Sequence, residues 1–218
     1  MLISEDRKFI FIAVPKTGST AVESHLMSLD PAIRRNEVPG AHDTWFPVHK
    51  HVRAAKIKEM MGARMADYTV VAFVRDPVST VVSKYFYYKV GRGAQRARQW
   101  KITRHLIQLR LRVLSAMVLP LRVWARFYPY SMTHEFVLDN QKNLLADLMG
   151  DFGNLQTEFE RIFVRFGFEP EELKLPMINQ TKSQKSKHEQ DQKLAEIVSK
   201  KARVDYELFT THVGRGGS

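Results

Sequence analysis

An uninterrupted apolar segment, residues 9–14, leads directly into the hexapeptide Pro-Lys-Thr-Gly-Ser-Thr at residues 15–20. A run that is apolar at every position predicts a strand buried on both faces, as in a parallel sheet covered by helices. Val22, Leu26 and Leu29 follow at helical spacing, and Pro31 should end that helix. The segment therefore predicts a strand, a tight loop and a helix in direct succession.

A second apolar strand is expected at residues 69–74, followed by Arg75-Asp76-Pro77. Proline is favoured in the first turn of a helix, so a new helix should begin here. Its apolar face would consist of Val78, Val81, Val82, Tyr85 and Phe86. Alternating strands and helices predict an α/β fold with three layers, α/β/α, around a central parallel sheet.

The rest of the chain is expected to be mostly helical. Helices are predicted at residues 53–61, in the basic segment up to a break at Pro120, from Leu155 to Gly167, and at residues 192–209, whereas residues 30–48 are expected to form a loop. At 218 residues the chain is expected to form one domain, 1–218, with a helical insert at about 94–132 and a frayed tail at about 213–218.

The chain is strongly basic. It has 34 Lys and Arg against 23 Asp and Glu, a net charge of +11, with an isoelectric point near 9.9. This balance favours polyanionic partners, including nucleic acid, anionic membranes, acidic glycans and phosphorylated cofactors. The absence of cysteine excludes disulfides, thiolate nucleophiles and cysteine-based zinc sites. Residues 1–8 lack the apolar core of a signal peptide, and residues 113–121 are too short to span a bilayer, so we expect a soluble, cytoplasmic protein.

The loop at residues 15–20 has the composition of a phosphate-binding turn. A turn from a strand into a helix presents backbone N–H groups and the positive helix end to an anion. Gly18 permits close approach, and Lys16 adds a mobile positive charge. Thr17, Ser19 and Thr20 add hydroxyl donors. In nucleoside triphosphatases the loop lysine follows the last glycine, whereas here Lys16 precedes Gly18. No strand is expected to end in an Asp that could hold magnesium. Both features argue against a kinase or ATPase.

Arg75 and Ser83 form the second candidate phosphate contact. Arginine is well shaped for bidentate phosphate recognition, although Arg75 could instead pair with Asp76. Ser83 lies about two turns into the following helix, so both would reach one phosphate only if the loop folds back.

Together these segments resemble the sulfotransferases that use 3′-phosphoadenosine 5′-phosphosulfate (PAPS). In that family a Pro-Lys-x-Gly loop, here Pro15 to Thr20, binds the 5′-phosphosulfate. A strand followed by Arg-[Asp/Asn]-Pro and a later Ser-x-Tyr, here Arg75-Asp76-Pro77 and Ser83-Lys84-Tyr85, binds the 3′-phosphate. The resemblance implies a P-loop-NTPase-like fold.

The resemblance is strongest to carbohydrate sulfotransferases of the glycan 2-O type. It extends to His49-Lys50-His51-Val52 and to residues 81–88, 151–159, 175–179 and 205–209. Gly153 departs from the pattern of the broader family, in which many members carry a glutamate before Asn-Leu. The role of that glutamate is therefore not transferred to this chain.

The resemblance implies direct in-line transfer of a sulfuryl group from PAPS to a hydroxyl of a glycan or glycolipid, with adenosine 3′,5′-bisphosphate as product and no metal. His51 would be the base, His49 would assist or contact the acceptor, and Lys16 would stabilise the leaving phosphate. The donor-binding set would be Pro15, Lys16, Thr17, Gly18, Ser19, Thr20, Arg75 and Ser83, with Thr181 and Lys182 closing over the 3′-phosphate from a late loop.

Other functions fit parts of the sequence. A P-loop-like kinase would share the strand–loop–helix turn, and a non-catalytic polyanion-binding module would account for the charge of +11. The basic segment from Arg92 to Arg126 has three interpretations, taken in order: a solvated helix face, a lid or groove for an acidic acceptor, and a peripheral membrane contact through about residues 100–128. Nucleic acid is not expected as a partner.

Overall fold

The computed structural model describes residues 1–40, 44–90, 104–127, 132–176 and 188–212. Two compact units are present: one comprises residues 1–75, 132–179 and 207–218, and the other comprises residues 76–131 and 180–206. The prediction of a single domain with an insert at 94–132 stays a prediction.

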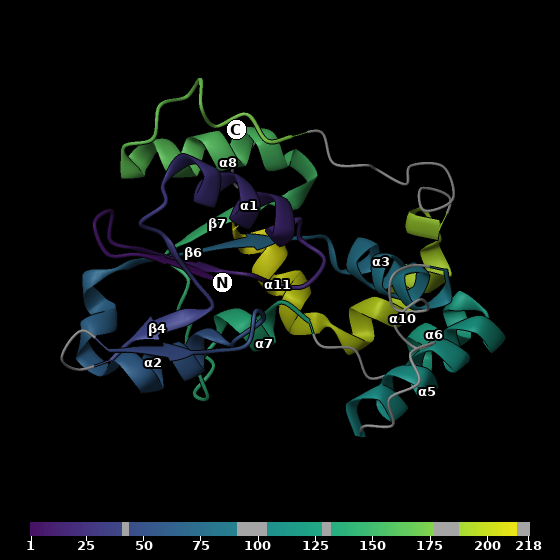
Figure 1. Ribbon diagram of the computed structural model, residues 1–218. Helices are drawn as coiled ribbons and strands as arrows, with labels where there is room; N and C mark the ends of the chain where they lie inside the picture. Colours follow the sequence, from purple (N-terminus) through teal and green to yellow (C-terminus); the bar gives the residue numbers. More distant parts are fainter. Residues whose placement is uncertain (41–43, 91–103, 128–131, 177–187, 213–218) are drawn as a thin grey trace. The chain divides into compact units, whose positions relative to one another are not determined.

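The first unit contains a mixed five-stranded sheet (Figure 1). Its strands are β1 (Leu2–Ser4), β2 (Phe9–Ile12), β3 (Arg34–Arg35), β6 (Thr69–Val74) and β7 (Leu148–Asp151), in the order β3-β1-β2-β6-β7. The pairs β2–β6 and β6–β7 are parallel, whereas β1 is antiparallel to both of its neighbours. The predicted central parallel sheet is confirmed for β2, β6 and β7, whereas β1 and β3 add an antiparallel edge that was not predicted. A three-residue strand such as β1 is too short to show a diagnostic period.

Alternate side chains of the central strands enter two different cores, which explains why β2 and β6 are apolar throughout. Phe9 and Phe11 of β2 pack with α1 (Ser19–Leu29) and α8 (Leu155–Phe163) on one face. Ile10 and Ile12 pack with α2 (Ala54–Met61) and α7 (His134–Val137) on the other. The first unit thus has helix, sheet and helix layers (Figure 1).

Short elements complete the first unit. A hairpin of β4 (Glu37–Pro39) and β5 (Trp45–Pro47) occupies the segment expected to be a loop. The 3₁₀ turns are η1 (Gly62–Asp67), η2 (Phe152–Asn154) and η3 (Val164–Phe166), the last followed by Gly167 in the left-handed region as a helix C-cap.

The expected final helix at 192–209 is two helices, α10 (Gln192–Lys201) and α11 (Arg203–His212), because the chain leaves helical geometry at Ala202.

The described part of the second unit is helical. Its helices are α3 (Pro77–Lys89), α5 (Arg104–Val118), α6 (Leu121–Phe127) and α10. Pro77 begins α3 as predicted, and the Asp76 carboxylate caps it by accepting a hydrogen bond from the Ser79 N–H at 2.7 Å. The break predicted at Pro120 is confirmed between α5 and α6, where the Tyr85 hydroxyl donates to the Leu119 carbonyl at 2.9 Å.

Candidate functional site

The loop between β2 and α1 has an unusual backbone. Both Lys16 (φ 74°) and Gly18 (φ 71°) adopt the left-handed region, which is unfavourable for lysine and natural for glycine. Thr17 between them is buried, and its hydroxyl donates to the Val14 carbonyl at 2.9 Å. That hydroxyl proton therefore stabilises the turn itself.

Gly18 is required at its position for two independent reasons. Besides its positive φ, a Cβ atom there would lie 2.9 Å from both Leu155 Cδ2 and Phe152 Cε2. Gly18 is also the N-cap of α1, and the first turn of that helix carries no acidic side chain. Because N–H groups in a first helical turn lack intrahelical partners, this end of α1 favours an anion.

Arg75 joins the end of β6 to the same loop. Its Nη1 donates to the Lys16 carbonyl oxygen at 3.3 Å, and its guanidinium carbon lies 4.7 Å from the centre of the Phe152 ring. Phe152 therefore supports both Gly18 and Arg75, the latter by a cation–π contact. Sequence reasoning did not identify this role, because nothing in the local pattern distinguishes Phe152 from an ordinary core aromatic residue.

Glu23 and Lys50 form a polar connection that the sequence analysis missed. The Lys50 ammonium lies 3.0 Å from Glu23 Oε2 and donates to Thr20 Oγ1 at 2.8 Å. Glu23 is fully buried on α1 and also contacts Arg35, at 3.5 Å, and the amino group of Met1. Burial alone would raise the pKa of Glu23, but the hydrogen bonds and charges of the Met1 amino group and Lys50 outweigh it and lower that pKa. The only sequence signal was a carboxylate three residues before Leu26 on the apolar face of a predicted helix.

His49 and His51 belong to a turn over residues 49–52. The Val52 N–H closes this turn by donating to the His49 carbonyl at 3.0 Å. The two side chains would project to the same side if the segment were extended, but it is not extended. His51 Nδ1 lies 2.6 Å from the Ala13 carbonyl oxygen, which can only accept, so Nδ1 carries the proton and Nε2 is the acceptor nitrogen of the neutral ring. His49 Nδ1 instead accepts from the His51 backbone N–H at 3.1 Å, which leaves its Nε2 as the donor in the neutral ring.

The environment of His51 favours its neutral form. Burial lowers the pKa of the half-buried ring most strongly, the bond to Ala13 opposes this, and the positive charge of Lys50 and the neighbouring His49 lower the pKa further. The net pKa lies below the usual value of 6.5, so His51 is a neutral proton acceptor at pH 7.

The remaining predicted donor contacts lie either in the second unit or outside the described residues. Ser83 is buried on α3 of the second unit, and its pairing with Arg75 stays a prediction. Thr181 and Lys182 lie outside the described residues.

The expectation that no strand ends in Asp is wrong. Asp151 ends β7, which neighbours β6. Its carboxylate accepts from the Gly153 N–H at 2.7 Å and from Asn154 Nδ2 at 3.3 Å, so it caps η2. A Cβ on Gly153 would lie 2.8 Å from Asp151 Oδ2, so any larger residue there would require the Asp151 carboxylate to shift.

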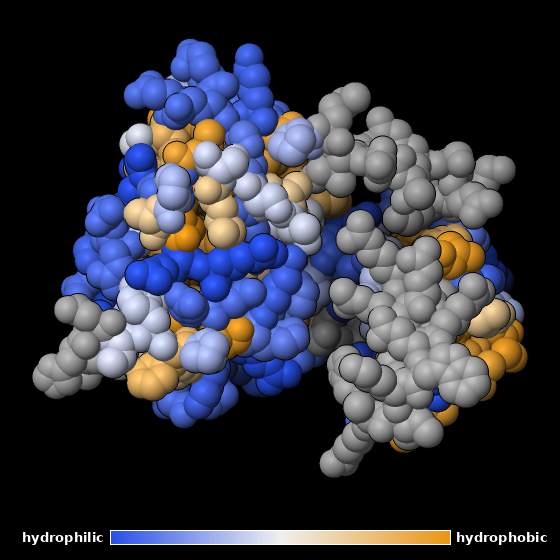
Figure 2. Space-filling model, in the orientation of Figure 1, coloured by the Kyte–Doolittle hydropathy of each residue, from blue (hydrophilic) through white to orange (hydrophobic). Residues whose placement is uncertain are grey.

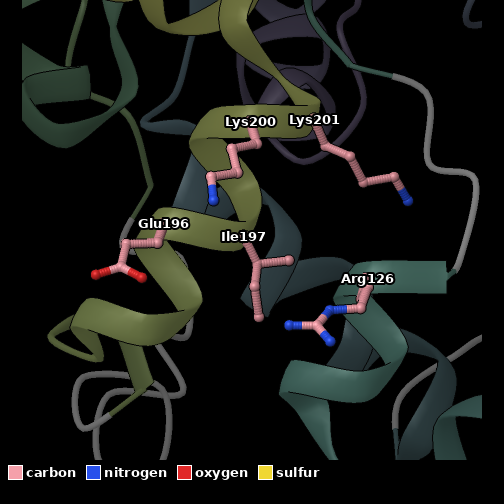
Figure 3. A pocket seen from close by; sticks show the side chains of 5 residues that line it. All are labelled: Arg126, Glu196, Ile197, Lys200 and Lys201. Atoms are coloured by element: carbon pink, nitrogen blue, oxygen red, sulfur yellow. The ribbon is translucent and has the colours of Figure 1, made fainter.

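A cavity of about 330 Å³ opens in the second unit (Figure 3). Arg126 of α6 lines it together with Glu196, Ile197, Lys200 and Lys201 of α10. The three cations give it a net positive lining, and burial lowers the pKa of Lys201. None of the residues predicted to act in transfer lines it.

Within the described ranges, no three or more His, Cys, Asp or Glu side chains gather into a group that could hold a metal ion. Of the helices that the structure describes, none has both the length and the hydropathy needed to cross a bilayer.

Comparison with known families identifies the chain. The model of a family described as "Sulfotransferase family" matches residues 1–114, which is just over half of the 218 residues and includes the β2–α1 loop, the His49–Val52 turn and Arg75. Neither the curated proteins nor the solved structures gave a match. The chain belongs to the sulfotransferase family.

Proposed function

We propose that this protein transfers the sulfuryl group of PAPS to an acceptor hydroxyl, with the β2–α1 loop acting as a P-loop-like cradle for the 5′-phosphosulfate. One observation carries the proposal: His51 donates from Nδ1 to Ala13, at the end of the strand that enters the loop. This bond fixes a neutral base at the entrance of a turn suited to an anion.

The donor set fits a doubly phosphorylated nucleotide. Residues 14–20 contain no acid, and the turn is bordered by the cations Lys16, Lys50 and Arg75. Pro15, Ser19 and Thr20 complete the loop, and the first turn of α1 supplies backbone N–H groups. We assign the 3′-phosphate to Arg75, with Ser83, Thr181 and Lys182 as further contacts.

In the proposed reaction His51 Nε2 accepts the proton of the acceptor hydroxyl as its oxygen bonds to sulfur. The bond between sulfur and the bridging phosphate oxygen breaks, and Lys16 stabilises the negative charge that remains on that phosphate. PAPS supplies the activated sulfuryl group and leaves as adenosine 3′,5′-bisphosphate. His49, with its Nε2 proton, is suited to donate a hydrogen bond to an acceptor oxygen rather than to act as the base.

The acceptor is proposed to be a carbohydrate hydroxyl, on a free glycan or a glycolipid. Support comes from the resemblance of His49-Lys50-His51-Val52 to the glycan 2-O-sulfotransferases.

The test is a transfer assay with PAPS and a panel of saccharides, read both as released adenosine 3′,5′-bisphosphate and as acceptor mass increase. Lys16→Ala should reduce the rate by about 10²–10³-fold, and His51→Asn by about 10²–10⁴-fold. His212→Asn, an exposed histidine of α11, is the matched control and should keep full activity. If the Lys16→Ala and His51→Asn variants bind the bisphosphate and transfer at the wild-type rate, the roles assigned to Lys16 and His51 are wrong. Consumption of ATP in place of PAPS would contradict the proposed function.

A further inference from the structure

The net positive charge of this protein comes from its second unit. Residues 76–131 and 180–206 contain eighteen Lys and Arg against five Asp and Glu, a net charge of +13. The first unit contains sixteen Lys and Arg against eighteen Asp and Glu, a net charge of −2. The stretch 77–134 has no acidic residue at all. The proposed donor loop does not account for this excess, since it lies in the other unit.

Helix α5 in this unit has two apolar faces. Val113 and Ala116 face inward and are buried. A second stripe, separated by intervals of four, three and four residues, is exposed and consists of Ile107, Leu111, Leu114 and Val118. At 100° per residue these four side chains fall within about 60° of one another, so they form one continuous ridge. Leu111 and Leu114 expose 62% and 58% of their surface, and Val118 exposes 69%.

Helix α6 also exposes apolar side chains, and both helices carry exposed cations. Val123 and Phe127 are exposed on α6, Phe127 by 72%. Arg110 and Arg112 are exposed on α5, and Arg126, adjacent to Phe127 in the chain, lines the cationic cavity with Lys200 and Lys201. Figure 2 shows apolar side chains along the right edge of the view, in the region of α6. An aligned set of exposed leucines and valines of this kind is uncommon on a surface that contacts only water.

We propose that the α5–α6 ridge docks this protein onto the surface of an anionic phospholipid bilayer. Exposed apolar side chains beside arginines, with no acid between residues 77 and 134, match the composition of helices that lie in the membrane interface. The apolar ridge enters the acyl boundary, and the flanking cations contact lipid phosphates. A soluble acidic glycan would use the cations and leave the leucines without a role. A second copy of the chain would bring two units of charge +13 together, which opposes self-association.

The test measures sedimentation of the full chain with vesicles of phosphatidylcholine alone and of phosphatidylcholine with about 30% phosphatidylserine, an anionic lipid. Binding is expected only to the anionic vesicles, to weaken with salt, and to fall by about tenfold or more in Leu111→Gln/Leu114→Gln. Both leucines are exposed, so this variant should keep the wild-type melting temperature. Val164→Gln, an exposed apolar position of the first unit, is the matched control and should bind as wild type does.

Three results would overturn the proposal. Absence of binding to the anionic vesicles excludes the bilayer. Equal binding of wild type and the double leucine variant shows that charge alone acts. A dimer in light scattering that the double variant loses, without any change in vesicle binding, assigns the ridge to a second copy of the chain.

Discussion

At the scale of single residues, Lys16 combines an unfavourable backbone with the charge proposed to act in transfer. Its φ of 74° is held by the turn that Thr17 and Gly18 build, and a lysine in the left-handed region costs about 1–2 kcal/mol. Such strain is typical of functional positions, where the side chain cannot be exchanged for glycine without losing its chemistry.

This predicts opposite effects on stability and activity at one position. Lys16→Gly removes the backbone strain, whereas Lys16→Ala retains it. The glycine variant should therefore have a free energy of unfolding about 1 kcal/mol higher than the alanine variant. Both variants lose the ammonium group and should transfer with the same reduced rate. Urea denaturation and the transfer assay check the two parts, and equal stability of the glycine and alanine variants would show that the turn is not strained at Lys16.

The pH dependence of transfer should report the environment of His51. The base acts when neutral, so the rate falls as pH decreases through its pKa in the folded protein. Because burial and the charge of Lys50 lower that pKa, the pH at which the rate falls to half its maximum on the acid side should lie below 6.5.

Lys50→Gln is the matching variant for this pH profile. It removes a charge that lowers the pKa of His51, so the acid limb should move to higher pH. A wild-type acid limb above pH 6.5, or a limb that stays in place in Lys50→Gln, would contradict the assignment of His51 as the base.

At the scale of elements, Glu23 connects α1 to the His49–Val52 turn through Lys50. The carboxylate is fully buried among the cationic groups of Lys50, Arg35 and Met1, so removing its charge leaves those groups uncompensated. Breaking a buried ion pair from one side typically costs about 3–5 kcal/mol.

Glu23→Gln should therefore lower the free energy of unfolding by about 3 kcal/mol, as measured by urea denaturation. The control is Glu59→Gln, which breaks the exposed pair with Lys56 and should change stability by less than about 1 kcal/mol. Equal effects of the two substitutions would mean that the buried cluster does not hold α1 and the turn together.

The predictable elements were those with a strong local signal. β2 and β6 are apolar at almost every position because both faces are buried, and α3 begins at a proline capped by Asp76. β1, β3 and the β4–β5 hairpin escaped prediction because each has only two or three residues, and their pairing depends on partners distant in sequence.

The candidate site divides in the same way. The loop residues and both histidines were identifiable from composition and order in the sequence. Phe152, Lys50 and Glu23 were not, because their roles arise from contacts between segments: Phe152 touches Gly18 and Arg75, and Lys50 joins Thr20 to Glu23. The orientation of His51 was also beyond the sequence, since it is set by one hydrogen bond to Ala13.

At the scale of the whole molecule, the net positive charge and the β2–α1 loop lie in different units. The unit with the β2–α1 loop has a net charge of −2, and the helical unit has +13. The basic isoelectric point therefore says little about the donor loop, where a few placed cations matter more than the sum. The excess charge is instead available for the anionic surface proposed for α5 and α6.

The central claim is that the β2–α1 loop and Arg75 receive a nucleotide with phosphates at both the 3′ and 5′ positions. Thermal melting of the full chain with adenosine 3′,5′-bisphosphate, ATP or sulfate at about millimolar concentration tests it most directly, because a ligand that binds only the folded state raises the melting temperature. The account predicts a clear increase with the bisphosphate, a smaller one with ATP and sulfate, and loss of the increase in Arg75→Ala. An unchanged melting temperature with the bisphosphate, or a larger increase with ATP, would contradict it.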